Sequence, residues 1–318
     1  MKTYSTYKDS GVEWLGEIPE HWETIKLGFL GDFSASGIDK HIKKSESLVK
    51  IINFTDVYGN LNKIIDSSLN FMEVTTPEEN RKKHLVKKGD MIFLPSSETY
   101  EDLGLSALVN EELENTSFSY HVIRLVLKKD INHSFRKYFT NNNFVLNQFA
   151  RQGKGSTRKI IGRNVFKNII VIIPTQNEQI KIANFLDEKT SKIDKAITIK
   201  KNQIELLKER SFSLINKAVT KGINPNVKLK DSGVEWIGEI PNHWKVKRLK
   251  YVFQILKRIS GELGHSVLSI TQRGIKVKDT ESGSGQLSMD YSKYQFVNKG
   301  DFAMNHMDLL TGYVDISK

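Results

Sequence analysis

Apolar residues fall into short clusters up to about residue 174 and into one long stripe after it. Clusters rich in β-branched residues and closed by turn residues predict four strands, at 49–54, 91–94, 120–127 and 168–173. Lys88-Gly-Asp90 predicts a tight turn, and Pro95 and Pro174 end two of the strands. Aromatic and leucine positions at helical intervals predict a helix over 135–149. The fold class predicted for residues 1–174 is α+β.

The long stripe predicts a coiled-coil type of helix. Thr175-Gln-Asn-Glu178 fits a capping box, in which the threonine hydroxyl and the glutamate carboxylate satisfy amides at a helix start. The apolar positions then repeat with heptad spacing and are Leu186, Ile193, Ile197, Ile204, Leu207 and Leu214. A helix of about 44 residues would be on the order of 65 Å long, too long for one small domain to cover. We therefore expect a spacer helix over 175–222 that pairs with another helix.

One segment of the chain occurs twice. Residues 9–22 return as residues 231–244, and the copies differ only at Leu15/Ile237 and Glu20/Asn242. A second echo relates Val86-Lys-Lys-Gly-Asp90 to Val297-Asn-Lys-Gly-Asp301. Such repetition indicates the start of a second unit. We expect residues 223–318 to form an incomplete second copy of the first domain, without its own long helix.

Composition narrows the classes of partner. The chain has 48 Lys and Arg against 37 Asp and Glu, a net charge of +11, which favours nucleic acid over a membrane surface. A basic protein without an anionic partner is the alternative. The absence of cysteine excludes disulfides, thiolate zinc sites and cysteine nucleophiles. With no apolar leader and no membrane-length run, we expect a cytoplasmic protein that does not contact membranes.

Three segments are candidates for contact with nucleic acid. Phosphates require cations, and base edges require guanidinium, amide or hydroxyl groups. The first segment offers both kinds of group in Arg151, Lys154, Gly155, Ser156, Thr157, Arg158, Lys159 and Arg163. The others are the basic group Arg81, Lys82 and Lys83 and the polar pair Ser96 and Ser97. For each segment the alternative is a solvated surface without a ligand.

The sequence offers no catalytic residue and no metal site. It has no phosphate-binding loop, no His-Glu-x-x-His motif and no tetrapeptide of the amino-methyltransferases. Four tryptophans and two histidines recur with the repeat, namely Trp14, Trp22, Trp236, Trp244, His21 and His243. We interpret them as structural, with the tryptophans packing the domain against the helix ends.

The combination resembles the specificity (S) subunit of type I restriction–modification systems. The resemblance rests on the Gly-Val-Glu-Trp-x-Gly-Glu-Ile-Pro-x-His-Trp motif at 11–22 and 233–244, and on Ile173-Pro-Thr-Gln-Asn-Glu-Gln-Ile180. Phe185-Leu-Asp187 and the stretch 203–222 also belong to it. These segments cover essentially the whole chain in the expected order.

The resemblance implies a target recognition domain at 1–174, the spacer helix at 175–222 and the start of a second recognition domain at 223–318. Two such domains would read the two halves of a bipartite sequence in double-stranded DNA. The S subunit is not an enzyme. It binds modification (M) subunits, which methylate adenine with S-adenosylmethionine, and restriction (R) subunits, which use ATP and Mg to translocate and cut DNA. The chain itself is then expected to bind no cofactor.

Three alternatives remain open at this level. A half-subunit could self-associate through its long helix to read a symmetric site. A decoy could bind partner subunits without reading DNA. A self-contained nuclease or methyltransferase is the third alternative, and the missing motifs argue against it.

Overall fold

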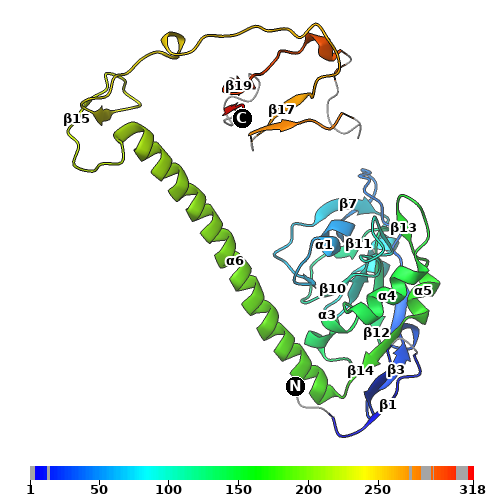
Figure 1. The fold of residues 1–318 in the computed structure, drawn as a ribbon. Coiled ribbons are helices and arrows are strands. Elements are labelled where there is room, and N and C mark those ends of the chain that lie inside the picture. The colour runs from blue at the N-terminus through cyan, green and yellow to red at the C-terminus, as the bar shows by residue number, and fades with distance from the viewer. Residues whose placement is uncertain (1–3, 13–14, 272–273, 281–287, 289, 306–313) are drawn as a thin grey trace. The chain divides into compact units, whose positions relative to one another are not determined.

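The computed structural model describes residues 4–12, 15–271, 274–280, 288, 290–305 and 314–318. The chain forms two compact units, Met1–Leu206 and Leu207–Lys318. The long helix α6 (Gln176–Lys221) contributes to both units (Figure 1).

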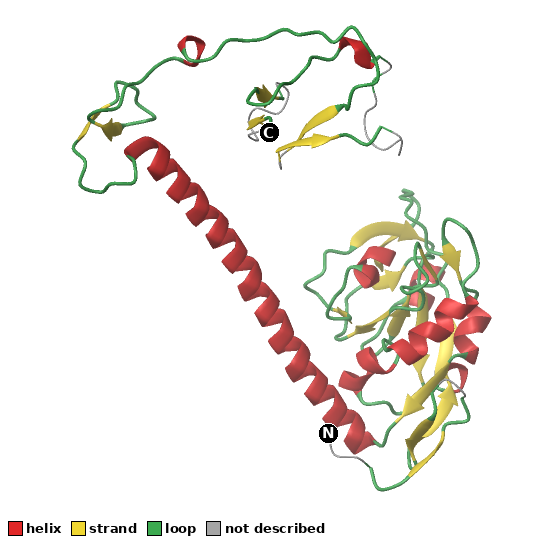
Figure 2. Ribbon diagram, in the orientation of Figure 1, coloured by secondary structure: helices red, strands yellow, loops and turns green. Residues whose placement is uncertain are grey.

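Two sheets form the body of the first unit (Figure 2). The larger has the strand order β4 (Gly31–Ser34), β12 (Ile123–Leu127), β8 (Met91–Phe93), β10 (Ser106–Val109) and β6 (Ile64–Ile65). Strands β10 and β6 are parallel, and the other neighbours are antiparallel. The smaller sheet has the order β11 (Thr116–Phe118), β5 (Ser47–Ile52) and β7 (Met72–Thr76), with β11 parallel to β5. Two further pairs join β14 (Ile170–Ile173) to β3 (Glu23–Lys26) and β13 (Lys159–Ile160) to β9 (Ser96–Ser97).

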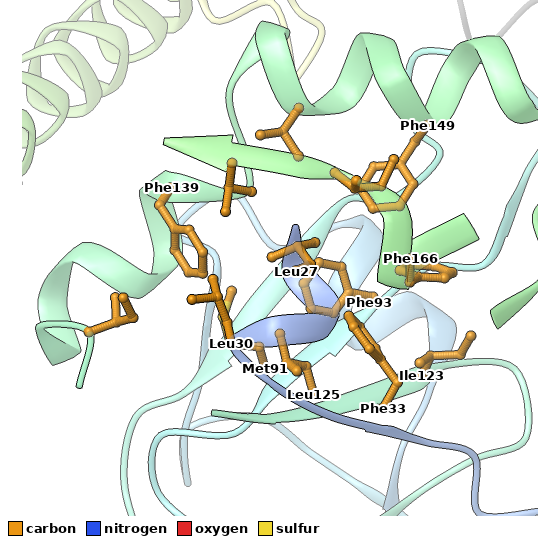
Figure 3. Close-up of a cluster of buried hydrophobic side chains, with 14 of the residues drawn as sticks. Leu27, Leu30, Phe33, Met91, Phe93, Ile123, Leu125, Phe139, Phe149 and Phe166 are labelled. Atoms are coloured by element: carbon orange, nitrogen blue, oxygen red, sulfur yellow. The ribbon is translucent and has the colours of Figure 1, made fainter. Parts of the chain in front are cut away.

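An aromatic cluster packs helices onto the larger sheet. The helices of this unit before α6 are α1 (Phe54–Tyr58), α2 (Glu78–His84), α3 (Arg136–Phe139), α4 (Asn143–Gln152) and α5 (Arg163–Asn168). Figure 3 shows Phe93 of the sheet beside Phe149 of α4 and Phe166 of α5. The ring centroids of Phe149 and Phe166 are 4.9 Å apart, and those of Phe93 and Phe166 are 5.6 Å apart. Each such pair contributes about 0.5–1.5 kcal/mol beyond the area it buries.

The α+β class is confirmed, but the predicted helix over 135–149 is wrong. A short 3-10 turn and α3 end at Phe139, and α4 begins at Asn143. Polar residues cause the break. The Asn141 side chain accepts a hydrogen bond from the Ser106 amide and donates one to the Ser106 carbonyl, both at 2.9 Å. Asn142 then caps α4 by accepting from the Val145 amide at 3.1 Å.

Two predicted strands have different ends in the structure. Strand β12 starts at Ile123 and not at Tyr120, because the Val122 amide turns back to the Ser119 carbonyl. Strand β5 ends at Ile52, and Phe54 begins α1, where the Asp56 carboxylate accepts from the Asn53 amide at 2.6 Å. These shifts place Phe54 and residues 120–121 outside the sheets, where their side chains are available for other contacts.

The long helix is confirmed. Helix α6 has 46 residues and is therefore about 69 Å long. Its first turns pack on the first unit, where Gln179 and Ala183 are buried. The predicted heptad residues from Ile193 to Leu214 are 47–64% exposed, while Leu186 is half-buried.

The two copies of the repeat fold into the same hairpin. Strands β1 (Tyr7–Asp9) and β2 (Glu17–Pro19) pair in one copy, and β15 (Leu229–Asp231) and β16 (Glu239–Pro241) pair in the other with matching register. Gly11 and Gly233 both have φ of 72°, a left-handed conformation that favours glycine. The equality shows that short-range interactions fix this hairpin.

The second repeated segment, at 86–90 and 297–301, also has the same structure in both copies. Gly89 and Gly300 have φ of 94° and 91°, and in each copy the following aspartate accepts from the amide three residues earlier. In the second unit this turn precedes β19 (Phe302–Met304), which pairs with β20 (Val314–Ile316). A further hairpin joins β17 (Leu268–Thr271) to β18 (Gly274–Val277). Ile240 is the one buried hydrophobic side chain among the described residues of this unit beyond α6.

Candidate nucleic-acid interface

The structure joins two segments that the sequence identified separately. Strand β13 pairs antiparallel with β9, with Lys159 opposite Ser97 and Ile160 opposite Ser96. We call residues 151–163 the basic loop. This segment includes β13 and the residues on either side of it. Its middle part folds back on itself through a bridge between Lys154 and Ile160.

Gly155 allows the basic loop to close. It has φ of 119°, and a Cβ placed on it would lie 2.2 Å from the carbonyl oxygen of Arg158. A side chain at this position would therefore meet both strain and a backbone clash. Gly153 is similar, since a Cβ there would lie 2.6 Å from a methyl carbon of Leu103. The glycines shape the loop that carries the cations.

Arg158 and Lys159 are held by neighbouring groups. The Nε of Arg158 donates to the Ser96 Oγ at 3.1 Å, and its guanidinium lies 5.1 Å from the centre of the Phe54 ring. The Lys159 ammonium donates to the Gly155 carbonyl at 2.9 Å. Both side chains thus have defined directions.

The remaining predicted residues of the basic loop lie at its surface. The exposed ones are Arg151, Lys154, Gly155, Ser156 and Thr157, and Arg163 is exposed at the start of α5. The loop therefore presents cations with two hydroxyl groups between them.

Two other predicted contacts differ from expectation. Ser97 is 1% exposed, and its Oγ accepts from the Thr99 amide, so it is not a surface hydroxyl like Ser156 and Thr157. Arg81 forms two hydrogen bonds with Glu78 on the same helix, at 2.6 and 2.7 Å, which use its guanidinium locally. Lys82 and Lys83 on the same helix are exposed.

Sequence reasoning missed a hollow beside Arg158. The hollow has a volume of about 290 Å³ and is lined by Lys40, Phe54, Thr55, Tyr58, Ser97, Glu98, His121 and Arg158. Burial lowers the pKa of His121, and the positive charges of Lys40 and Arg158 lower it further. These residues come from five separate stretches of the chain. The usable signal in the sequence is Tyr120-His121, two residues that lie before β12 and not within the predicted strand 120–127.

Glu178 joins the start of α6 to the repeat. Its carboxylate accepts hydrogen bonds from the His21 Nε2 at 3.0 Å and from the Trp22 Nε1 at 3.1 Å. It also accepts from the amide and hydroxyl of Thr175, at 3.1 and 2.7 Å. Burial raises the pKa of Glu178, but these hydrogen bonds outweigh it and lower the pKa to about 2.

These contacts bear on two predictions, the capping box at 175–178 and the packing of the tryptophans at the helix ends. The carboxylate half of the capping box is confirmed, but the Thr175 hydroxyl donates to Glu178 and does not accept from an amide. Packing at a helix end is confirmed for Trp22 and wrong for Trp236, which is 86% exposed. Trp14 lies outside the described residues.

A second polar contact fixes the helix about two and a half turns further on. Asp187 of α6 accepts from the Lys137 ammonium at 2.6 Å and from the Tyr138 hydroxyl at 2.5 Å. The Lys137 side chain is 14% exposed and that of Asp187 is 41% exposed, so solvent screens this pair only in part. The first unit thus holds α6 at two carboxylates.

Within the described ranges of the chain, no helix combines the length and apolar character that crossing a membrane requires. Nor do three or more His, Asp or Glu side chains gather there in a geometry that could hold a metal ion.

Comparison with known proteins identifies the family. The model of the type I restriction modification DNA specificity domain matches residues 19–209, which include the basic loop and most of α6. The chain belongs to this family. The resemblance found in the sequence is thereby confirmed.

The specificity-domain chain has relatives in Methanocaldococcus jannaschii. It is 25% identical over 242 residues to the provisionally assigned MjaX specificity subunit, covering 74% of this chain and 53% of that protein. It is also 25% identical over 247 residues to the type I restriction enzyme MjaVIII specificity subunit, covering 75% and 50%. The chain thus spans about half the length of these curated relatives.

A solved structure has the same fold. It belongs to a study of complex assembly and conformational transition in the type I R-M system. The TM-score is 0.50 at 12% identity, over 68% of this chain and 49% of the other.

Proposed function

We propose that this chain is a non-catalytic specificity subunit that binds double-stranded DNA through its basic loop. The supporting observation is the arrangement of that loop, in which exposed cations and hydroxyl groups project from a turn anchored on β9. The net charge of +11 and the family membership agree with this function. One recognition domain would read one half of a bipartite site.

Different residues of the basic loop would contact the phosphates and the bases. Lys154, Arg151 and Arg163 are exposed cations suited to phosphates, which set affinity and register. Ser156 and Thr157 lie between them, and their hydroxyls can donate to or accept from base edges. Binding through such contacts releases counterions and therefore weakens steeply with salt.

A binding titration tests this function. Duplexes from a randomised library are offered to the full chain, the bound fraction is sequenced, and the recovered duplex is titrated at several salt concentrations. We expect one enriched motif and a steep salt dependence for its affinity. Lys154→Ala should weaken binding to all duplexes and reduce the salt slope by about one. Weak binding without any enriched motif would favour the decoy and refute sequence recognition.

We also propose that α6 pairs with a second helix. Its heptad residues are 47–64% exposed from Ile193 to Leu214, and an uncovered stripe of this length is unfavourable in water. The partner offered by the sequence itself is the same stripe on a second copy of this chain. Modification and restriction subunits would then assemble on the pair, and S-adenosylmethionine, ATP and Mg would bind to those subunits.

Sedimentation of the purified chain tests the pairing. We expect a concentration-dependent dimer, and Leu207→Glu should return it to a monomer because it places a charge in the stripe. Asn202→Glu, which adds the same charge on the exposed face opposite the stripe, is the matched control and should leave the dimer intact. A wild-type chain that remains monomeric at every concentration would assign the stripe to a different partner.

A further inference from the structure

Arg158 differs from the other cations of the basic loop because its guanidinium is already oriented. The hydrogen bond from its Nε to the Ser96 Oγ fixes one edge of the group. The Phe54 ring, 5.1 Å from the guanidinium carbon, supports the group, and this ring in turn stacks on Tyr58 with centroids 5.2 Å apart. An arginine fixed in this way loses little further freedom when it binds a ligand.

The outer edge of this guanidinium is available. Among the residues that the structure describes, neither terminal nitrogen of Arg158 has a hydrogen-bond or ion-pair partner. Two parallel N–H groups on a fixed plane match a pair of acceptors on one edge of a planar ligand. In the major groove of DNA, guanine offers such a pair at O6 and N7.

The surroundings of Arg158 favour a base over a phosphate. Glu98 lines the same hollow, and its carboxylate repels a phosphate but can accept from the amino group of cytosine. His121 lines it too and is biased to its neutral form, which offers one donor and one acceptor. Arginine also binds phosphate with two nitrogens, and Lys40 lines the same hollow, so the Glu98 carboxylate is the group that favours a base here.

We propose that Arg158 is a specificity-determining residue that reads a guanine in the major groove through its two terminal nitrogens. Phe54 and Ser96 act as positioning residues, and Glu98 faces the paired cytosine. This inference rests on the proposed DNA-recognition function and adds to it a base and a residue.

The test compares Arg158→Lys with Lys154→Ala in the randomised-library experiment. Arg158→Lys keeps the charge but loses the planar pair of donors. We expect the wild-type motif to contain one G·C pair whose preference falls roughly 5- to 150-fold in Arg158→Lys, with the salt slope unchanged. Lys154→Ala should keep that preference while all affinities fall. Phe54→Leu should reduce the same preference partly, since it removes the supporting ring.

A chemical substitution in the DNA gives an independent measurement. Replacing the guanine by 7-deazaguanine removes the N7 acceptor and should weaken binding by the wild-type chain more than binding by Arg158→Lys, whose ammonium lacks the fixed pair of donors. If the wild-type chain enriches no motif, the DNA-recognition function itself fails. If it enriches a motif that Arg158→Lys enriches with the same preference, this inference fails and the function stands. If the variant does not fold, wild-type binding that tolerates 7-deazaguanine at every guanine of the motif overturns the inference.

Discussion

Replacing Glu178 by glutamine tests how the recognition domain holds its long helix. The carboxylate accepts from His21, Trp22 and Thr175, whose donor atoms lie within 3.1 Å. A glutamine side chain has one acceptor oxygen and an NH₂ group that faces these donors. The substitution Glu178→Gln therefore removes both the charge and half of the acceptors.

The expected cost follows from the pKa of Glu178. A pKa shift from 4.5 to about 2 corresponds to about 3 kcal/mol of folding stability if solvent does not weaken the interactions of the carboxylate. Its partner His21 is 47% exposed, so we expect about 1–2 kcal/mol. Because the folded pKa is depressed, this contribution is present above pH 4.5 and is lost as the pH falls towards 2.

Denaturation and hydrogen exchange measure this effect. Glu178→Gln should lower the free energy of unfolding at neutral pH and speed exchange in the first turns of α6. Below about pH 4 the wild-type protein should approach the variant. The matched control is Glu188→Gln on the same helix, which removes one exposed pair with Lys192 and should cost at most about 0.5 kcal/mol. Equal effects of the two substitutions, with no difference in acid sensitivity, would refute the role of Glu178.

Three further substitutions test local parts of the structure. Gly155→Ala should weaken DNA binding about tenfold and lower the free energy of unfolding by about 1 kcal/mol, because it strains and distorts the basic loop; titration and denaturation check both, and unchanged DNA binding would argue against the loop as the interface. Tyr138→Phe removes a hydrogen bond to Asp187 and should cost about 1.5 kcal/mol in denaturation, and no cost would argue against the second contact of α6. Gln148→Leu leaves a backbone N–H and C=O of β14 without partners and should cost about 2–3 kcal/mol in the same assay; a neutral result would show that water replaces the side chain.

The features that the sequence predicted best are those fixed by neighbouring residues. The turn at Lys88-Gly-Asp90 forms because its aspartate accepts from the Lys87 amide, three residues earlier. The same geometry returns at residues 297–301, although its surroundings differ. Helix α6 was predictable for a similar reason, since a heptad pattern and a local cap define it. Periodicity and turn chemistry contain this information directly.

The hollow beside Arg158 was not predictable, because it depends on contacts between distant segments. Phe54 reaches it through the end of β5, and His121 reaches it through the loop that follows β11, a strand parallel to β5. Arg158 arrives by the pairing of β13 with β9. The contact between Glu178 and Trp22 is similar, since 156 residues separate them. A local sequence pattern cannot predict a contact between residues so far apart in the chain.

The repeated hairpin meets both ends of α6 with different contacts. At the start, the Trp22 indole donates to Glu178. At the end, Gly222 has φ of 77°, and a Cβ on it would lie 3.7 Å from the Trp244 ring and 3.6 Å from that of Pro241. In each copy the backbone amide of this tryptophan donates to the proline carbonyl three residues earlier, Trp22 to Pro19 and Trp244 to Pro241. The two helix ends differ. The start offers the Glu178 carboxylate, which accepts several hydrogen bonds, and the end offers Gly222, which has no side chain. One repeated sequence can therefore join a domain to either end of a helix, provided that the helix supplies the complementary residue.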